Sequence, residues 1–371
     1  MKNDLHGILY TLRAEPELRD LVMHRNSASI PFGGRYRLID FALSSMVNAG
    51  ARDVGVIMER DYQSLLDHLS NGKDWGLSRR NGGLRLLPPF GLPEAHAGSF
   101  SGCMEALLSV KSYIEEIPHE DIVLSTGDYV GNVDLSAAAE QHRSSGAEIT
   151  AVCVDQTASV PHHRYLPDGD GFSTRLCYSD GRMTDGLGCT EIYILKKHLL
   201  LSLMAYCGDG GFRHFHRDAM EHYLAEGGKV GIYIHEGYFR RIRTSQDYYK
   251  ASMEMLRKDV MAQFFPEDRP IRTKDRAEVS TYYSDAAKVT NCLVADGCYV
   301  EGELKNCVLF RGVKIEKGAK LENCVILQDT VVQAGAQLKC VITDKDSVIT
   351  PGCFLAGTER LPILVPKGST V

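Results

Sequence analysis

The sequence has little of several features that would assign it to a special class of protein. Its 371 residues include one tryptophan, and no apolar run approaches the ~20 residues that a transmembrane helix needs. Lys and Arg do not outnumber Asp and Glu, and the formal net charge of −6 argues against a nucleic-acid partner. The first residues lack the basic, apolar and small-residue order of a signal peptide. We therefore expect a cytoplasmic protein that does not contact a membrane.

The chain has eleven cysteines, of which the five from Cys103 to Cys207 are scattered. No two are spaced as C-x-x-C, the usual spacing of zinc and redox pairs. In a cytoplasmic chain, scattered cysteines are typically free thiols that pack as small apolar side chains. Two histidine pairs, His162 with His163 and His214 with His216, are interpreted as surface loop residues rather than metal ligands. The sequence thus predicts neither a metal site nor a bound cofactor.

The length of the chain predicts two domains, because a single core rarely grows past about 250–300 residues. Over residues 1–251, apolar runs such as Ala51–Met58 and Asp121–Ser125 alternate with segments of helical spacing such as Leu135–Ser144. That alternation predicts an α/β domain with a mainly parallel sheet. Ligands of such sheets bind beyond the carboxyl ends of the strands. Residues 252–287 are expected to form a helix and an extended linker.

Residues 288–371 change to a period of six. Two interleaved sets show this spacing: Cys307, Val313 and Ala319, and Leu309, Ile315 and Leu321. Residues two apart in a strand share a face, so the two sets place one inward stripe on each short strand. Three such hexapeptides form one triangular coil, which predicts a parallel β-helix of about four to five coils. A β-sandwich, the alternative, would not keep this phase.

The tripeptides of this region repeat as well. Asn323-Cys324-Val325 is followed sixteen residues later by Lys339-Cys340-Val341. This similarity predicts that Cys340 occupies the place of Cys324 one coil further on.

One run of residues resembles a known family. It reads Ile30-Pro31-Phe32-Gly33-Gly34-Arg35-Tyr36-Arg37-Leu38-Ile39-Asp40-Phe41 and is followed by Asn48-Ala49-Gly50. The run is similar, almost residue for residue, to the signature of the ADP-glucose pyrophosphorylases. The resemblance implies a nucleotidyltransferase-type α/β sandwich followed by a left-handed parallel β-helix. It also implies a reaction in which adenylyl is transferred from ATP to glucose 1-phosphate.

The phosphate-binding loop of that family is altered in this chain. Counting back from the shared run places it on Leu12-Arg13-Ala14-Glu15-Pro16-Glu17, and there is no glycine between Gly7 and Gly33. Side chains keep the backbone from closing on phosphate, proline removes a donor, and glutamates repel an anion. The family's Glu-Lys-Pro element for glucose 1-phosphate is also missing from Pro161–Gly169. We do not expect this chain to hold ATP as its relatives do.

The metal-binding carboxylates of the family are altered too. The resemblance places the first on Asp128, whereas Arg241 replaces the second and Arg243 replaces a glycine. On a strand, positions 241 and 243 would share a face, so we expect one of these arginines to pair with Asp128. A cation in place of a carboxylate repels Mg²⁺. The catalytic site is therefore predicted to be a remnant.

Several arginines are candidates for binding an anion or effector. Arg25 matches the arginine of the family's effector segment, in which Ser27 replaces a lysine. Arg240, Arg241 and Arg243 either bind an anion or form salt bridges. These features predict a regulatory D-type subunit that joins a catalytic ADP-glucose pyrophosphorylase subunit in a homo- or hetero-tetramer and responds to a phosphorylated effector. A divergent active nucleotidyltransferase and a stand-alone sugar-phosphate sensor remain as alternatives.

Overall fold

A computed structural model describes residues 5–11, 16–59, 61–88, 100–155, 163–178 and 185–371. The fold divides into two compact units, each built from several chain segments. The first unit comprises Met1–Arg13, Ile39–Arg241 and Pro266–Arg272, and the second comprises Ala14–Leu38, Ile242–Phe265 and Thr273–Val371. The limits expected from the sequence, 1–251, 252–287 and 288–371, stay predictions about where separate domains begin and end.

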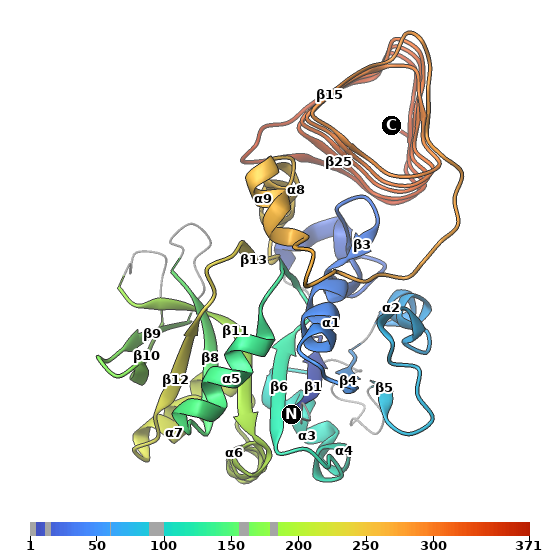
Figure 1. The fold of residues 1–371 in the computed structure, drawn as a ribbon. Helices are drawn as coiled ribbons and strands as arrows, with labels where there is room; N and C mark the ends of the chain where they lie inside the picture. Colours follow the sequence, from blue (N-terminus) through green and yellow to red (C-terminus); the bar gives the residue numbers. More distant parts are fainter. Residues whose placement is uncertain (1–4, 12–15, 60, 89–99, 156–162, 179–184) are drawn as a thin grey trace. The chain divides into compact units, whose positions relative to one another are not determined.

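The first unit is built on a nine-stranded sheet in the order β5-β4-β1-β6-β11-β8-β12-β10-β9 (Figure 1). Strands β5, β4, β1 and β6 pair in parallel, as do β8 and β12, while β11 and β10 run against their neighbours. The predicted strands near residues 51–58 and 121–125 are confirmed. The strands are β1 Leu5–Tyr10, β4 Asp53–Ile57, β5 Gly83–Leu87, β6 Asp121–Thr126, β8 Ile149–Val154, β9 His163–Pro167, β10 Phe172–Tyr178, β11 Leu187–Lys196 and β12 Val230–Ile234.

Helices cover both faces of this sheet. Ile8 lies in the apolar cluster under α3 and α6, whereas Gly7, on the other face, lies against Met46 of α1. A Cβ on Gly7 would come within 2.6 Å of the Met46 sulfur, so a larger residue there would require the Met46 side chain to shift. Among the residues that the structure describes, none of the helices has the length and apolar character to cross a membrane. The α-helices are α1 Leu38–Asn48, α2 Gln63–Leu69, α3 Cys103–Ser109, α4 Lys111–Glu115, α5 Leu135–Ser145, α6 Lys197–Gly210 and α7 Glu221–Ala225.

The second unit contains a three-sided parallel β-helix. Its sides are three five-stranded parallel sheets, β14-β17-β20-β23-β26, β15-β18-β21-β24-β27 and β16-β19-β22-β25-β28. The predicted six-residue period is confirmed, since all six residues of the two sets are at most 2% exposed. The strands are β14 Tyr282–Tyr283, β15 Lys288–Thr290, β16 Leu293–Val294, β17 Tyr299–Val300, β18 Glu303–Lys305, β19 Val308–Leu309, β20 Lys314–Ile315, β21 Lys320–Glu322, β22 Val325–Ile326, β23 Val331–Val332, β24 Gln337–Lys339, β25 Val341–Thr343, β26 Val348–Ile349, β27 Phe354–Ala356 and β28 Ile363–Val365.

The predicted place of Cys340 was wrong by one residue. The pairing of β21 with β24 and of β22 with β25 puts Cys340 beside Asn323 rather than beside Cys324. Both Asn323 and Cys340 have a left-handed backbone, with φ of 54° and 50°. Val341 therefore fills the inward place of Cys324 and is fully buried. The corner of the coil, not the cysteine, sets the phase of the repeat.

An asparagine ladder runs along this corner. Asn291 Nδ2 donates to Asn306 Oδ1 at 2.9 Å, and Asn306 Nδ2 donates to Asn323 Oδ1 at 2.9 Å. All three asparagines have φ between 51° and 54°. Asparagine tolerates this left-handed conformation better than most side chains do. The same residue type thus satisfies both the turn and the stacking of coils.

The run that resembles the pyrophosphorylase signature forms a short hairpin in the second unit, from β2 (Pro31–Phe32) and β3 (Tyr36–Arg37). Phe32 lies against Phe264 of α9 (Lys258–Phe264), and Tyr248 of α8 (Ser245–Glu254) donates from its hydroxyl to the carbonyl of Pro31 at 2.8 Å. Gly33 has φ of 59° and turns the hairpin. Beyond it, in the first unit, Asp40 is buried and bonded to His68 Nε2 at 2.6 Å. Pro31, Phe32 and Asp40 thus take part in packing and hydrogen bonds, and Gly33 in the turn.

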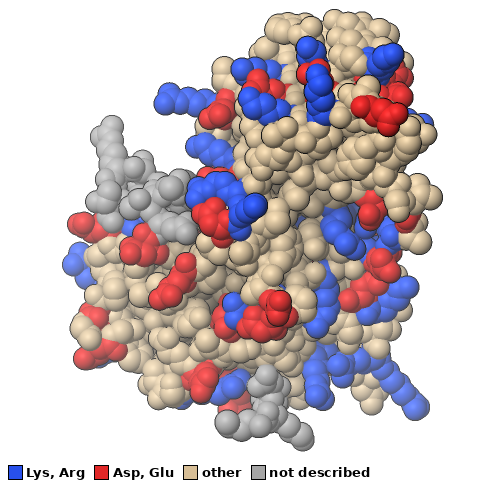
Figure 2. Space-filling view, turned by 45° about the horizontal axis from the view of Figure 1, so that its top comes forward, with Lys and Arg blue, Asp and Glu red and all other residues tan. Residues whose placement is uncertain are grey.

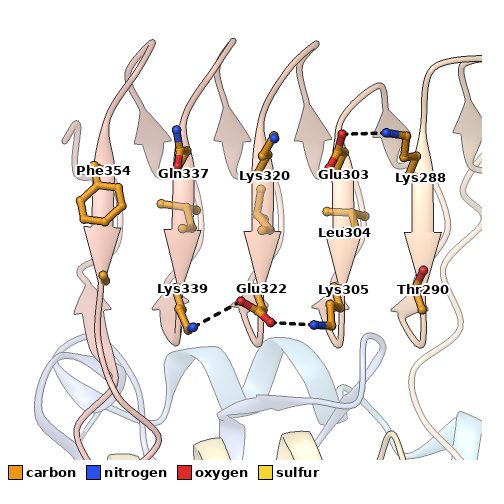
Figure 3. Close-up of a pocket in the computed structure, with 13 residues that line it drawn as sticks. Lys288, Thr290, Glu303, Leu304, Lys305, Lys320, Glu322, Gln337, Lys339 and Phe354 are labelled. Atoms are coloured by element: carbon orange, nitrogen blue, oxygen red, sulfur yellow. Dashed lines mark hydrogen bonds and ion pairs between the residues drawn. The ribbon is translucent and has the colours of Figure 1, made fainter.

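Charged side chains of both signs are mixed on the surface. Figure 2 shows Lys and Arg interspersed with Asp and Glu over the visible face. On the β15-β18-β21-β24-β27 side of the β-helix, Lys288 pairs with Glu303 at 3.0 Å (Figure 3). Glu322 pairs with Lys305 at 2.9 Å and with Lys339 at 3.4 Å. These pairs border a shallow hollow of about 500 Å³. Exposed pairs of this kind add little stability.

Candidate functional site

The candidate site lies where β6 ends. Asp128 follows this strand directly and precedes β7 (Tyr129–Gly131), which pairs antiparallel with β13 (Phe239–Arg241). In that register Arg241 stands opposite Tyr129, so its side chain begins next to Asp128. The carboxyl ends of parallel strands are the edge at which α/β sheets bind ligands.

The guanidinium of Arg241 lies between two carboxylates. Its Nε donates to Asp128 Oδ1 at 3.0 Å and Nη2 donates to Asp128 Oδ2 at 3.2 Å. Its Nη1 contacts Oε1 of Glu191 on β11. Thr126 donates to Asp128 at 2.6 Å, and Tyr10 donates to Glu191 at 3.2 Å. The side chains of Arg241, Asp128 and Glu191 are 17%, 18% and 9% exposed, so water screens these contacts only partly.

Neighbouring side chains determine the protonation states of Arg241 and Tyr10. Burial opposes the charge on Arg241, but Asp128 and Glu191 outweigh burial and raise the pKa of Arg241 well above its ordinary value. Burial, followed by the neighbouring Cys103 and Glu191, raises the pKa of Tyr10 well above its ordinary value. Tyr10 therefore keeps its proton and remains a donor to Glu191. One permanent cation is matched by two carboxylates that also accept hydrogen bonds.

This arrangement does not fit the Mg²⁺ that the family resemblance implies. A magnesium site needs carboxylate oxygens around a centre that water or phosphate oxygens can share. Here both oxygens of Asp128 and one of Glu191 face a guanidinium that cannot lose its proton. No step of a metal-assisted reaction can be derived from these residues.

Sequence reasoning missed Glu191. The only available signal was a single carboxylate within the apolar run of β11, and nothing in the sequence connected it with Asp128. Its backbone is also unusual, because φ is 62°. A left-handed conformation costs a residue other than glycine about 1–2 kcal/mol. The contacts with Arg241 and Tyr10 hold Glu191 there.

The other two arginines of the predicted cluster are placed differently. Of the pair expected to reach Asp128, Arg241 makes the contact. Strand β13 ends at Arg241, so the expectation that Arg243 shares a strand face with it was wrong. Arg243 lies in the second unit and is half-buried. Arg240 is buried, and its Nε donates to Tyr238 Oη at 3.2 Å.

The interpretation of the histidines as surface residues was wrong for His216. It is 7% exposed, in the π-helix Phe215–Met220, and its ring stacks on that of His163 with centroids 4.1 Å apart. Potential ligand atoms of His163, Glu191 and His216 lie within 4.8 Å of one another. The charge of Arg241 beside Glu191 opposes a cation at this point. His162 lies outside the described residues.

Arg25 lies in a separate basic cluster within the second unit. Its Nη2 donates to Asp344 Oδ1 at 2.9 Å, and both side chains are almost fully buried. Its Nη1 donates to the carbonyl of Leu21 at 3.3 Å. Burial, and then Arg37 and Arg25, lower the pKa of the adjacent Lys345 to about 8. Asp344 is thus the carboxylate bonded to Arg25, and basic residues lie on both sides of it.

Arg311 extends this cluster. It is 6% exposed, and burial, then Arg35 and Arg276, lower its pKa. Its Nε and one Nη have no hydrogen-bond partner among the described residues. A buried guanidinium with unused donors, close to other cations, is the kind of group that binds phosphate.

Comparisons with known proteins identify the class of both parts of the chain. Residues 17–165 match the family model for nucleotidyl transferases, and residues 278–359 match that for the GlmU-like C-terminal hexapeptide. The protein thus has a nucleotidyltransferase domain followed by a left-handed hexapeptide β-helix.

The similar proteins define the family more narrowly. The chain is 37% identical over 379 residues to the glycogen biosynthesis protein GlgD of Geobacillus stearothermophilus, covering 100% of the chain and 98% of that protein. It is 33% identical over 326 residues to GlgD of Bacillus subtilis (strain 168), with 86% and 83% covered. It is 28% identical over 297 residues to the glucose-1-phosphate adenylyltransferase of Clostridium botulinum (strain Eklund 17B / Type B), with 78% and 76% covered. The chain belongs to this ADP-glucose pyrophosphorylase-like family, on its D-type branch.

Proposed function

We propose that this chain is a regulatory subunit of a glucose-1-phosphate adenylyltransferase in cytoplasmic glycogen biosynthesis and makes no ADP-glucose by itself. The observation that carries the proposal is the guanidinium of Arg241 between Asp128 and Glu191. The names of the relatives support the pathway, since two are glycogen biosynthesis proteins and one is the adenylyltransferase.

The missing phosphate loop supports the same proposal. Residues 12–15 lie outside the described part of the chain, but the sequence of Leu12–Glu17 offers no glycine there. A glycine-rich backbone is what lets amide groups surround a triphosphate. Loss of the loop and a cation at the metal position remove two independent requirements of adenylyl transfer.

A preserved scaffold with a dismantled site suggests action through a partner. Homologous subunits of one fold can occupy equivalent places in a symmetric assembly. We therefore expect this chain to join a separate catalytic subunit in a hetero-tetramer. The basic cluster of Arg25, Lys345 and Arg311 is proposed as the place where a phosphorylated effector binds.

The proposal is tested by assaying ADP-glucose formation from ATP, Mg²⁺ and glucose 1-phosphate. The purified chain is measured alone, beside a catalytic homologue alone, and after co-expression of both, with the mass of the complex determined in parallel. We expect no turnover from the chain alone, and a mixed complex whose activity or effector response differs from that of the catalytic subunit. Turnover by the chain alone would refute the proposal.

Two further measurements separate the alternatives. Mg²⁺-dependent binding of ATP in calorimetry would favour a divergent active enzyme. Stabilisation by a sugar phosphate without any partner, together with no mixed complex, would favour a stand-alone sensor, because a ligand that binds only the folded state raises its stability.

A further inference from the structure

A second group of ionisable side chains lies at the other end of the same sheet. His6 on β1, Asp53 on β4 and Gly83 on β5 are register partners on neighbouring parallel strands. Tyr10, which contacts Glu191, is four residues further along β1, roughly 13 Å away at the rise of a strand. The group is therefore separate from the Arg241 site.

His6, Asp53 and His119 converge on one point, and the first two of them line a pocket of about 310 Å³. Potential ligand atoms of His6, Asp53 and His119 all lie within 4.8 Å of one another. His119 Nε2 is 3.9 Å from Asp53 Oδ2. His119 stands in the turn between α4 and β6, where its side chain can adjust more readily than one in a strand. Two imidazoles and a carboxylate are a common ligand set for zinc.

Neighbouring groups orient the two strand residues. His6 is 4% exposed, and its Nε2 lies 2.7 Å from Tyr113 Oη. The tautomer that donates from Nε2 to this hydroxyl leaves a lone pair on Nδ1. That nitrogen is buried and has no hydrogen-bond partner among the described residues. A metal-bound histidine characteristically donates its other N–H to an oxygen in this way.

The carboxylate of Asp53 is held in a similar manner. Its Oδ1 accepts from the backbone N–H of Gly83 at 2.7 Å, which leaves Oδ2 facing His119. The preceding Gly82 has φ of 79°, and a Cβ there would come within 1.7 Å of Asp53 Oδ1. Only glycine at position 82 lets the backbone approach the carboxylate so closely. The backbone at Gly82 and Gly83 thus fixes the position of the Asp53 carboxylate.

We propose that His6, Asp53 and His119 form a binding site for a divalent transition-metal ion, best suited to Zn²⁺. Ligand bonds of about 2.0–2.1 Å require donor atoms roughly 3.3 Å apart in a tetrahedron. His119 Nε2, now 3.9 Å from Asp53 Oδ2, would have to move closer when the ion binds. The fourth position opens toward the pocket, which Arg85 and Glu116 line, and takes water or a small anion. The site is independent of the regulatory function proposed above.

The test uses the full-length chain freed of metal with a chelator. Co²⁺ is added as a spectroscopic probe, since a tetrahedral site gives strong visible absorption bands, and Zn²⁺ binding is measured by calorimetry. We expect one ion per chain at this site. His119→Gln removes a ligand and lowers Zn²⁺ affinity by more than about tenfold, and Tyr113→Phe, which keeps all three ligands, lowers it about 10–100-fold.

The matched control is His163→Gln, which changes the other histidine and carboxylate cluster. It is expected to leave Co²⁺ absorption and Zn²⁺ affinity unchanged. Circular dichroism establishes that each variant is folded, and Tyr113→Phe keeps the test decisive if His119→Gln does not fold. The proposal is overturned if the wild-type chain binds no ion, or if His163→Gln rather than His119→Gln abolishes binding.

Discussion

Arg241 and Asp128 form a two-pronged ion pair, with Nε 3.0 Å from Oδ1 and Nη2 3.2 Å from Oδ2. This parallel geometry is the strongest that an arginine and a carboxylate adopt. The third prong of the guanidinium reaches Glu191 on β11. A single side chain thereby joins β13, β11 and the loop after β6, so its charge has become part of the packing of the first unit.

Arg241→Met should destabilise the first unit by about 3–5 kcal/mol, because it leaves Asp128 and Glu191 partly buried without their cation. The free energy of unfolding in urea measures this. Adding Glu191→Gln should recover part of the lost stability, because it removes one of the two negative charges that no longer have a cation between them. Arg257→Met, which breaks an exposed pair with Asp259, serves as the control and should leave stability unchanged. Equal stability of Arg241→Met and wild type would contradict the expected role of the ion pair.

Asp344→Asn should strengthen anion binding at the basic cluster. The amide oxygen can still accept from Arg25, but the only carboxylate bonded to that guanidinium among the described residues has lost its charge. We expect the affinity for inorganic phosphate to rise about tenfold, which corresponds to about 1.4 kcal/mol. Calorimetry measures the affinity. Asp346→Asn, two residues away and half exposed, is the control and should bind phosphate as the wild type does.

The pH dependence of stability should reveal Lys345. Its pKa is lowered from 10.5 to about 8 in the folded chain, so the unfolded chain binds more protons between these two values. The contribution of Lys345 to the free energy of unfolding therefore rises as the pH increases from about 8 to about 10.5. Lys345→Met should be more stable than wild type below pH 8 by up to about 3 kcal/mol, and this advantage should shrink toward pH 10.5. A stability difference between Lys345→Met and wild type that does not vary with pH would contradict the lowered pKa of Lys345.

The asparagine ladder gives a prediction for the β-helix. Asn306→Ala should lower its stability by about 2 kcal/mol, through two lost hydrogen bonds and the cost of a left-handed alanine. Asn306→Gly loses the same two hydrogen bonds, but glycine adopts the left-handed backbone without strain. Its loss of stability should therefore be about half that of Asn306→Ala. Urea unfolding of the full chain, monitored with a signal from the β-helix, gives the free energy of unfolding of each variant and so ranks the two. The reverse order would show that the backbone at residue 306 is not strained.

The β-helix was largely predictable from the sequence because its signal is local and repeated. Cys307, Val313 and Ala319 are six apart, and each coil presents the same pattern to its neighbours. The error at Cys340 arose because valine and cysteine fill an inward place equally well. Residue type alone therefore did not fix the phase, whereas the left-handed corner does.

The Arg241 site was predictable only in part. Replacement of an acidic residue by arginine indicated which group would meet Asp128, because both positions fall in recognisable motifs. Glu191 could not be found, since its place beside them depends on β11 running against β6 in the sheet. The burial of His216 was missed for a similar reason, because residues 163 and 216 meet only in three dimensions.

The contact of Glu191 with Arg241 also bears on how this chain can change during evolution. An acidic residue at position 241 would place three negative groups at one point, with no cation between them. The glycines of the family's phosphate-binding loop, in turn, would confer no advantage while the cation remained. Under the function proposed above, each single substitution toward the catalytic pattern is therefore unfavourable by itself.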